Sequence, residues 1–304
     1  MKVRTLDHLL VVVLQLALLV GSARAHPASG IVVDHNGRVF IVYSGHGVGE
    51  IQPDGKLRYL KQSTGGHWLA LDPLGSFSAV QPQYFERITS DGVKPALIFA
   101  DGGAPITVGH DGNLYYASGP SSREPGGLAL TRLSPAGQAM PFSPGLQKLL
   151  AEVDDGVTGL ATGFDGTLFV ASWTGLYKVA PDGTAAAIAR PVVVSDCDED
   201  RADHKPSNRL PLLRGLAADA AGNTFVAATS CHRVLKISPA GRVEIILKSE
   251  RPWTPTGVAL HSGDVYVLEY TNANGPSVEG WVPRIRKLGI DGKVTLIYSA
   301  ITTN

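Results

Sequence analysis

Cysteine, surplus charge and long apolar runs are all scarce in this sequence. The 304 residues include two cysteines, and 27 lysines and arginines balance 27 aspartates and glutamates. The lack of a basic surplus argues against nucleic acid as a partner, because binding to phosphates depends on clustered positive charge. Aromatic residues make up only 7% of the chain, whereas 35 glycines and 20 prolines indicate many turns between short strands.

The one long apolar run lies near the N-terminus. Basic residues precede the run at positions 9–20, and Ala23 and Ala25 supply the small residues of the pattern that a signal peptidase cleaves. The run is shorter than the roughly 20 residues that a membrane-spanning helix needs. We therefore predict a signal peptide over residues 1–25, a secreted or periplasmic location, and no membrane span after cleavage.

The two cysteines, Cys197 and Cys231, are predicted to form a disulfide bond. An even number of cysteines in an exported chain favours pairing, since the compartment is oxidising. The bond would tie down the long connection at residues 190–213.

A repeated pattern runs through the rest of the chain six times. Each unit has an apolar strand, a glycine turn, a second strand, a variable stretch, a third strand, a second glycine turn and a fourth strand. The first-turn glycines are Gly37, Gly75, Gly112, Gly166, Gly222 and Gly263, and the second-turn glycines are Gly55, Gly92, Gly137, Gly183, Gly241 and Gly292. Three residues after the first glycine, five units carry an aromatic residue and the second unit carries Ser78.

A basic residue precedes the apolar position of the third strand in five of the units. These residues are Arg87, Arg132, Lys178, Lys236 and Lys287. Alternation of a base with an apolar residue is typical of a strand with one buried and one solvated face, so we interpret the basic position as solvated.

Each unit predicts a four-stranded antiparallel sheet with two apolar faces, which radial packing against neighbouring sheets would bury. The expected fold is an all-β, six-bladed β-propeller of four-stranded antiparallel sheets, formed as a single domain by residues 26–304. No spare strand is evident at either end of the chain, so the ring should close by packing of the first blade against the last.

The segments at residues 216–219, 225–228 and 234–241 resemble NHL repeats, and the resemblance extends over essentially the whole mature chain. It implies the propeller fold. It does not imply one chemistry, because related propellers include hydrolases, lyases and binding modules.

The longest connections, at residues 118–128, 139–157, 190–213 and 271–283, should all emerge on one face of the ring. Long loops on a rigid scaffold are where binding usually occurs. We therefore predict that this face binds a small molecule, a glycan or a protein. The expected ligand-binding residues are His46, Trp173, Thr229, Trp253 and Trp281, and we expect the protein to be a monomer.

An alternative hypothesis places a metal-assisted lactonase or lyase at the channel mouth on the same face. Its candidate catalytic residues are His67, Arg214, Glu269 and Tyr270, which could transfer protons and stabilise charge.

Two family resemblances bear on this alternative. His67 resembles the position at which peptidyl-hydroxyglycine amidating lyases place a metal-binding histidine. Glu269 could supply the glutamate that the regucalcin and gluconolactonase lactone hydrolases bring to a calcium or zinc ion. These resemblances imply Ca²⁺ or Zn²⁺ bound by His67 and Glu269. The sequence departs from both patterns, because Thr158, Arg214 and Thr256 take the positions of further histidines and no matching Asn and Asp is evident.

One acidic segment also has the oxygen density that calcium prefers. Its acidic residues are Asp196, Asp198, Glu199, Asp200 and Asp203. The segment lacks the glycine and terminal glutamate of an EF-hand loop, so we interpret it as a solvated loop.

Overall fold

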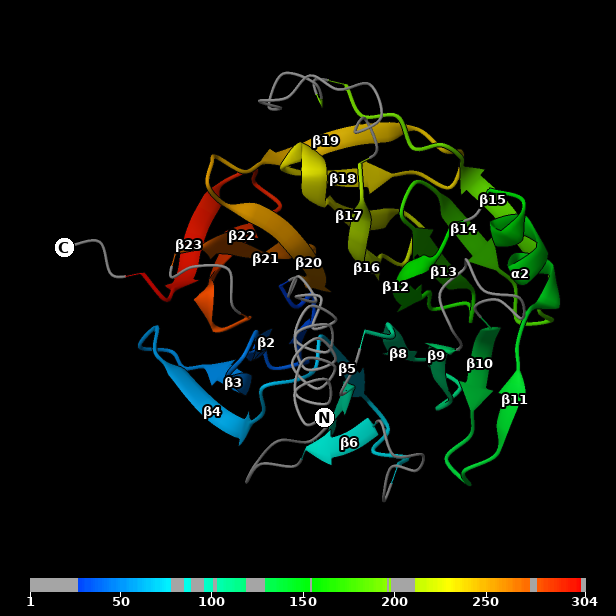
Figure 1. Ribbon diagram of the computed structural model, residues 1–304, viewed down its shortest axis with the longest axis horizontal. Coiled ribbons are helices and arrows are strands. Elements are labelled where there is room, and N and C mark those ends of the chain that lie inside the picture. The colour runs from blue at the N-terminus through cyan, green and yellow to red at the C-terminus, as the bar shows by residue number, and fades with distance from the viewer. Residues whose placement is uncertain are drawn as a thin grey trace, which may run out of the picture.

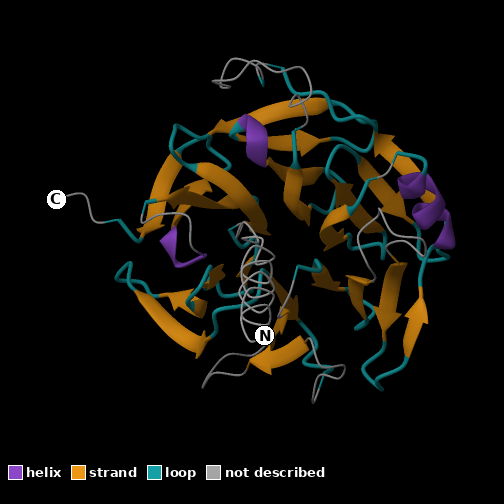
Figure 2. Cartoon of the chain, viewed as in Figure 1, coloured by secondary structure: helices purple, strands orange, loops and turns teal. Residues whose placement is uncertain are grey.

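The chain forms a ring of six β-sheets around a central axis (Figure 1). The structure is a computed structural model, and it describes residues 27–77, 85–88, 96–100, 103–118, 129–153, 155–195, 197, 211–273 and 278–301. Strands dominate these residues, and the helices are short (Figure 2). The predicted all-β, six-bladed propeller is confirmed. The predicted signal peptide lies outside the described residues.

The strands follow one another blade by blade. Blade 1 has β1 (Ile31–Val33), β2 (Val39–Tyr43), β3 (Gly47–Ile51) and β4 (Leu57–Gln62); blade 2 has β5 (Trp68–Asp72), β6 (Phe85–Ile88) and β7 (Ala96–Ala100); blade 3 has β8 (Ile106–Val108), β9 (Leu114–Ser118), β10 (Ala129–Leu133) and β11 (Ala139–Pro141). Blade 4 has β12 (Val157–Thr162), β13 (Leu168–Ser172), β14 (Leu176–Val179) and β15 (Ala185–Ala189); blade 5 has β16 (Leu213–Ala218), β17 (Thr224–Ala228), β18 (Arg233–Ile237) and β19 (Val243–Lys248); blade 6 has β20 (Thr254–His261), β21 (Asp264–Asn272), β22 (Trp281–Leu288) and β23 (Val294–Ser299). Helix α2 (Pro144–Ala151) and the 3₁₀ turns η2 (Thr229–Cys231) and η3 (Val278–Gly280) lie in connections.

In five blades the strand order follows the chain, from the innermost strand to the outermost. Blade 2 differs, because its described strands form a three-stranded sheet in the order β5-β7-β6. Strand β7 is apolar and fully buried, which suits the central position of a sheet. The second strand expected around Ser78 lies outside the described residues, in the unit that lacks the aromatic residue.

The glycine turns of the repeat are confirmed. All six first-turn glycines have a positive φ, between 62° and 86°, and the described second-turn glycines have φ between 77° and 87°. A side chain disfavours this backbone conformation, which explains why glycine recurs there.

In blades 3 to 6 the aromatic residue of the repeat lies opposite the basic residue on the neighbouring strand, whereas in blade 1 Phe40 lies opposite Glu50. The cross-strand pairs are Tyr115 with Arg132, Phe169 with Lys178, Phe225 with Lys236, and Tyr266 with Lys287. In blade 5 the Lys236 ammonium lies 5.7 Å from the centre of the Phe225 ring. The base therefore covers a buried ring with its aliphatic stem while its charge reaches solvent, which refines the predicted solvated face.

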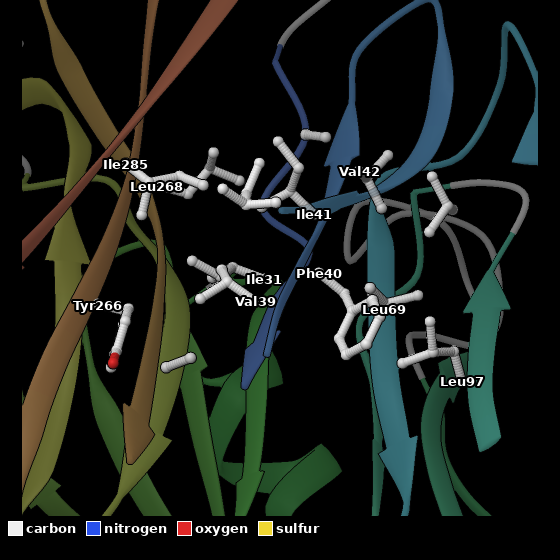
Figure 3. Close-up of a cluster of buried hydrophobic side chains, with 14 of the residues drawn as sticks. Ile31, Val39, Phe40, Ile41, Val42, Leu69, Leu97, Tyr266, Leu268 and Ile285 are labelled. Carbon is white, nitrogen blue, oxygen red and sulfur yellow. The ribbon is translucent and has the colours of Figure 1, made fainter. Parts of the chain in front are cut away.

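The ring closes by packing of blade 6 against blade 1, as expected. One core cluster joins blades 6, 1 and 2 (Figure 3). Its labelled members are Tyr266, Leu268 and Ile285 from blade 6, Ile31, Val39, Phe40, Ile41 and Val42 from blade 1, and Leu69 and Leu97 from blade 2. Two buried hydroxyls also cross this seam: Thr256 donates to the Ala28 carbonyl at 2.7 Å, and Tyr270 donates to the Val42 carbonyl.

Glycines let the innermost strands of neighbouring blades approach backbone to backbone. A Cβ atom on Gly257 would lie 2.3 Å from the Ser29 carbonyl oxygen, and one on Gly215 would lie 2.5 Å from the Gly257 Cα. A Cβ atom on Gly159 would similarly lie 2.5 Å from the Arg214 carbonyl oxygen. The tight packing around the axis therefore requires the absence of side chains at these positions.

We expect Gly257→Ala to lower the free energy of unfolding by about 1–3 kcal/mol, because the added methyl group would meet backbone that cannot move freely. Urea unfolding followed by circular dichroism would measure the change. The control is Gly145→Ala in α2, where a Cβ atom would meet only the Ala185 methyl, at 3.9 Å. Equal stability of Gly257→Ala and the wild type would contradict the close approach.

In the five blades whose strand order follows the chain, antiparallel pairing places the connections between second and third strands, and those leading to the next blade, on one face of the ring, which we call the loop face. The disulfide Cys197–Cys231, with a Cα–Cα distance of 4.7 Å, joins the connection between blades 4 and 5 to the turn that follows β17. Its prediction is confirmed. The acidic residues at 196 and 198–203 and the rest of the connection up to residue 210 lie outside the described residues, as do 119–128 and 274–277. No helix in the described part of the chain is long and apolar enough to cross a membrane.

Candidate functional site: the loop face

A chain of hydrogen bonds links the loop-face residues of blades 4, 5 and 6. These bonds run from Leu213 N to Trp173 O (3.0 Å), from Thr229 N to Leu212 O (3.2 Å), from Thr229 Oγ1 to Pro255 O (3.0 Å) and from His232 Nδ1 to Trp253 O (2.7 Å). We call Trp173, Leu212, Thr229, His232 and Trp253 the loop-face arc. Three predicted ligand-binding residues, Trp173, Thr229 and Trp253, are therefore linked by one chain of hydrogen bonds.

Asp155 fixes the turn that carries Trp173. Its buried carboxylate accepts hydrogen bonds from the Ser172 hydroxyl (2.7 Å), the Thr174 hydroxyl (2.6 Å) and the backbone amides of Gly156, Trp173 and Thr174 (2.9–3.2 Å). A carboxylate with this many donors orders the turn on both sides of the tryptophan. The indole of Trp173 nonetheless remains 43% exposed. The turn thus presents an aromatic surface on a rigid support.

The other predicted ligand-binding residues are more enclosed. The Arg284 guanidinium lies over the Trp253 ring, 4.3 Å from its centre, and so covers one face of the indole. Trp281 is partly buried against the core of blades 6, 1 and 2. His46 packs beside Tyr43 with ring centres 4.2 Å apart, and its Nδ1 donates to a backbone carbonyl at 2.9 Å. His46 and Trp281 do not belong to the loop-face arc.

Glu269 lies between blades 5 and 6 and is fully buried. Arg284 Nε and Arg286 Nε donate to its Oε2 at 2.6 and 2.8 Å, Arg286 Nη2 donates to Oε1 at 2.6 Å, and the Ser249 hydroxyl also donates to Oε1. Glu250, which is 62% exposed, binds the same two arginines from the solvent side. Both oxygens of Glu269 are therefore engaged: Oε2 binds the two arginines of blade 6, and Oε1 binds Arg286 and also Ser249, which follows the last strand of blade 5.

Tyr270 points to the opposite side of blade 6 from Glu269, because consecutive side chains alternate along a strand. Its hydroxyl donates to the Val42 carbonyl and accepts from the Ser44 amide at 3.2 Å. Burial raises the pKa of Tyr270 above its ordinary value. The structure consequently does not bring Glu269 and Tyr270 to a common point.

Arg214 is the second residue of β16, the innermost strand of blade 5. His67 directly precedes β5, the innermost strand of blade 2. Burial lowers the pKa of the Arg214 guanidinium to about 10, and the nearby Tyr270 opposes that shift. The carbonyl of His67 accepts from the amides of Ser29 and Gly30, at 2.9 and 2.8 Å, and so joins blade 2 to blade 1. These contacts make the backbone of His67 part of the ring.

A calcium or zinc ion at Glu269 does not fit the surroundings of this carboxylate. Two guanidinium groups already neutralise Glu269, and their positive charge would repel a cation. Within the part of the chain that the structure describes, no group of three or more His, Cys, Asp or Glu side chains could hold a metal ion. We derive no chemistry from a metal at this position.

Sequence reasoning missed Asp155, Arg284 and Arg286. The two arginines are separated by one residue on a buried strand, so both must lie on the same face and need an acidic partner. That pattern was a usable signal for the ion cluster. Asp155 directly precedes the innermost strand of blade 4, and nothing in its local sequence indicates which turn it would bind.

No protein-family model and no curated protein matches this sequence. Among solved structures, a luciferin-regenerating enzyme has a TM-score of 0.55 and 16% identity, covering 93% of this chain and 98% of that chain. A streptogramin B lyase has a TM-score of 0.51 and 12% identity, covering 93% and 86%. Virginiamycin B lyase from Staphylococcus aureus has a TM-score of 0.50 and 13% identity, covering 92% and 87%. At these identities the likeness concerns the fold, so the chain shares a β-propeller architecture with proteins of these kinds, while the NHL-repeat resemblance stays a prediction.

Proposed function

We propose that the protein is an exported, monomeric binding propeller that holds a ring-bearing ligand, such as a glycan or a planar small molecule, on the loop-face arc. The observation that carries the proposal is the exposed indole of Trp173 on a turn fixed by the Asp155 carboxylate. An indole offers a large apolar face on which a sugar or planar ring can stack. A turn that is already ordered loses little entropy when a ligand binds.

The polar groups near Trp173 are also arranged before any ligand arrives. The Trp173 carbonyl accepts from Leu213, in the segment that follows the disulfide-bonded connection. The Thr229 hydroxyl is oriented by its bond to Pro255. A rigid aromatic platform beside fixed polar groups is the arrangement that ordinary ligand sites use for affinity and orientation.

The alternative, a metal-assisted lactonase or lyase at the channel mouth, has less support. It needs Glu269 and Tyr270 to face a substrate, whereas Glu269 binds two arginines and Tyr270 binds the backbone of blade 1. His67 and Arg214 remain its candidate residues.

The test is a thermal-shift screen of monosaccharides, oligosaccharides and aryl compounds, followed by calorimetric titration of the compounds that raise the melting temperature. We expect Trp173→Ala to weaken binding about tenfold or more, which corresponds to loss of one aromatic anchor of about 1.4 kcal/mol. Tyr59→Ala is the matched control, since Tyr59 is also an exposed aromatic residue but lies on β4, the outermost strand of blade 1, and borders neither cavity. Binding that survives Trp173→Ala and is lost in His67→Ala or Arg214→Ala would overturn the proposal in favour of the channel mouth.

A further inference from the structure

A cavity of about 580 Å³ occupies the channel at the end opposite the loop face. The innermost strands of all six blades line this cavity, together with residues of the turns that follow these strands. We call the face that carries these turns the turn face, and the cavity the turn-face cavity. Its volume lies within the range of small-molecule sites, about 300–1,000 Å³. The described residues that border the cavity do not include the residues at the loop-face ends of the innermost strands, which are His67, Thr158, Arg214 and Thr256.

The deep wall of the cavity is aliphatic. Every blade contributes at least one large apolar residue to the lining, among them Ile31, Leu69, Ile106, Leu160, Leu216 and Val258. Such a wall would receive an apolar body, because transfer of apolar surface from water is favourable by roughly 25 cal/mol per Å².

Aromatic and polar groups stand at the mouth. The Phe164 ring, which is 68% exposed, stacks on the His110 imidazole with ring centres 4.7 Å apart and an interplanar angle of 24°. His261 from blade 6 and Thr107 from blade 3 also border the cavity. An exposed phenyl ring contributes little to packing of the blades, yet it is placed where it could contact a ligand entering the channel.

A second cavity of about 340 Å³ adjoins the first between blades 4 and 5. Phe164, Asp219 and Ala220 border both cavities, and Lys178 borders the second. The Asp219 carboxylate accepts hydrogen bonds from two backbone amides and the Asn223 side chain, at 2.8–2.9 Å. The Asp165 carboxylate, which also borders the second cavity, is likewise bound to the Thr167 amide and hydroxyl. Lys178 supplies the ammonium at this cavity, and none of the ion pairs formed by the described residues includes it.

We propose that the turn-face cavity binds a small amphiphile, with a ring-bearing apolar body inside the channel and one acidic group at the rim near Lys178. The enclosure by six strands and the cavity volume favour a small molecule over a protein segment. This site is independent of the loop-face arc, and each can exist without the other.

The test uses the full chain and the fluorescent probe 8-anilinonaphthalene-1-sulfonate, which combines aromatic rings with one acidic group. We expect saturable binding of one probe molecule per chain. Phe164→Ala should weaken it about tenfold or more, since one buried aromatic contact is lost. Lys178→Gln should weaken binding of the sulfonate probe but leave binding of its neutral relative N-phenyl-1-naphthylamine unchanged.

Two controls locate the probe. Ile290→Ala removes an apolar side chain that is 79% exposed, and Leu296→Ala removes one that is 60% exposed on the outermost strand of blade 6; neither residue lines either cavity. Both should bind the probe as the wild type does, with unchanged melting temperatures for all four variants. The inference is overturned if the wild type shows no saturable binding, if Phe164→Ala binds normally, or if Ile290→Ala weakens binding as much as Phe164→Ala.

Discussion

Replacing Glu269 by alanine is expected to lower the free energy of unfolding by about 3–5 kcal/mol, because removal of one partner of a buried ion pair leaves uncompensated charge. Arg284 and Arg286 donate three hydrogen bonds to this carboxylate, and both arginines are largely buried. Urea unfolding monitored by circular dichroism would measure the loss.

Glu250→Ala is the control for Glu269→Ala. Glu250 binds the same two arginines but is largely exposed, so its loss should cost less than about 1 kcal/mol. If Glu269→Ala were as stable as the wild type and instead lost a stoichiometric metal ion, the carboxylate would be a ligand and not a link between blades.

Removal of both cysteines, by Cys197→Ala with Cys231→Ala, is expected to lower the free energy of unfolding by about 3–4 kcal/mol. The bond closes a loop with a sequence separation of 34, and this cost follows from the chain entropy that such a loop removes from the unfolded state. The double variant leaves no free thiol to react, and chemical denaturation of both proteins under non-reducing conditions gives the difference.

Reductant supplies the control for the disulfide. Dithiothreitol should destabilise the wild type and leave the double variant unchanged, because the variant has no bond to reduce. Alkylation of two thiols in the denatured, unreduced wild type would contradict the bond itself.

The fold could be predicted because the repeat carries its own local chemistry. Glycines such as Gly37 and Gly166 occur where the backbone needs a positive φ, and the aromatic residue three positions later is buried in every blade that has one. The strand order of blade 2 was not predicted, because the order β5-β7-β6 depends on which strand best fills the central position of the sheet. Pairing between strands is a tertiary property that local sequence does not determine.

The candidate site was harder to predict. The repeat predicts that Glu269 and Tyr270 end the second strand of blade 6 and so share one mouth, whereas strand β21 continues to Asn272. Alternation directs the two side chains to opposite sides of blade 6, and the partner of Tyr270, the Val42 carbonyl, lies in blade 1, more than 200 residues away in the sequence. Trp173 was identified by its place in the repeat, but its support by Asp155 appears only in three dimensions. The turn-face cavity is set by the separation of six innermost strands and has no local signal.

The loop face is proposed to bind through an exposed aromatic surface, while the buried polar side chains hold the blades together. The measurement that tests this most directly is the dissociation constant of the best glycan or aryl ligand in Trp173→Ala and in Glu269→Gln. The account predicts a dissociation constant raised about tenfold in Trp173→Ala and nearly unchanged in folded Glu269→Gln. Normal affinity in Trp173→Ala, together with lost affinity in Glu269→Gln, would contradict it.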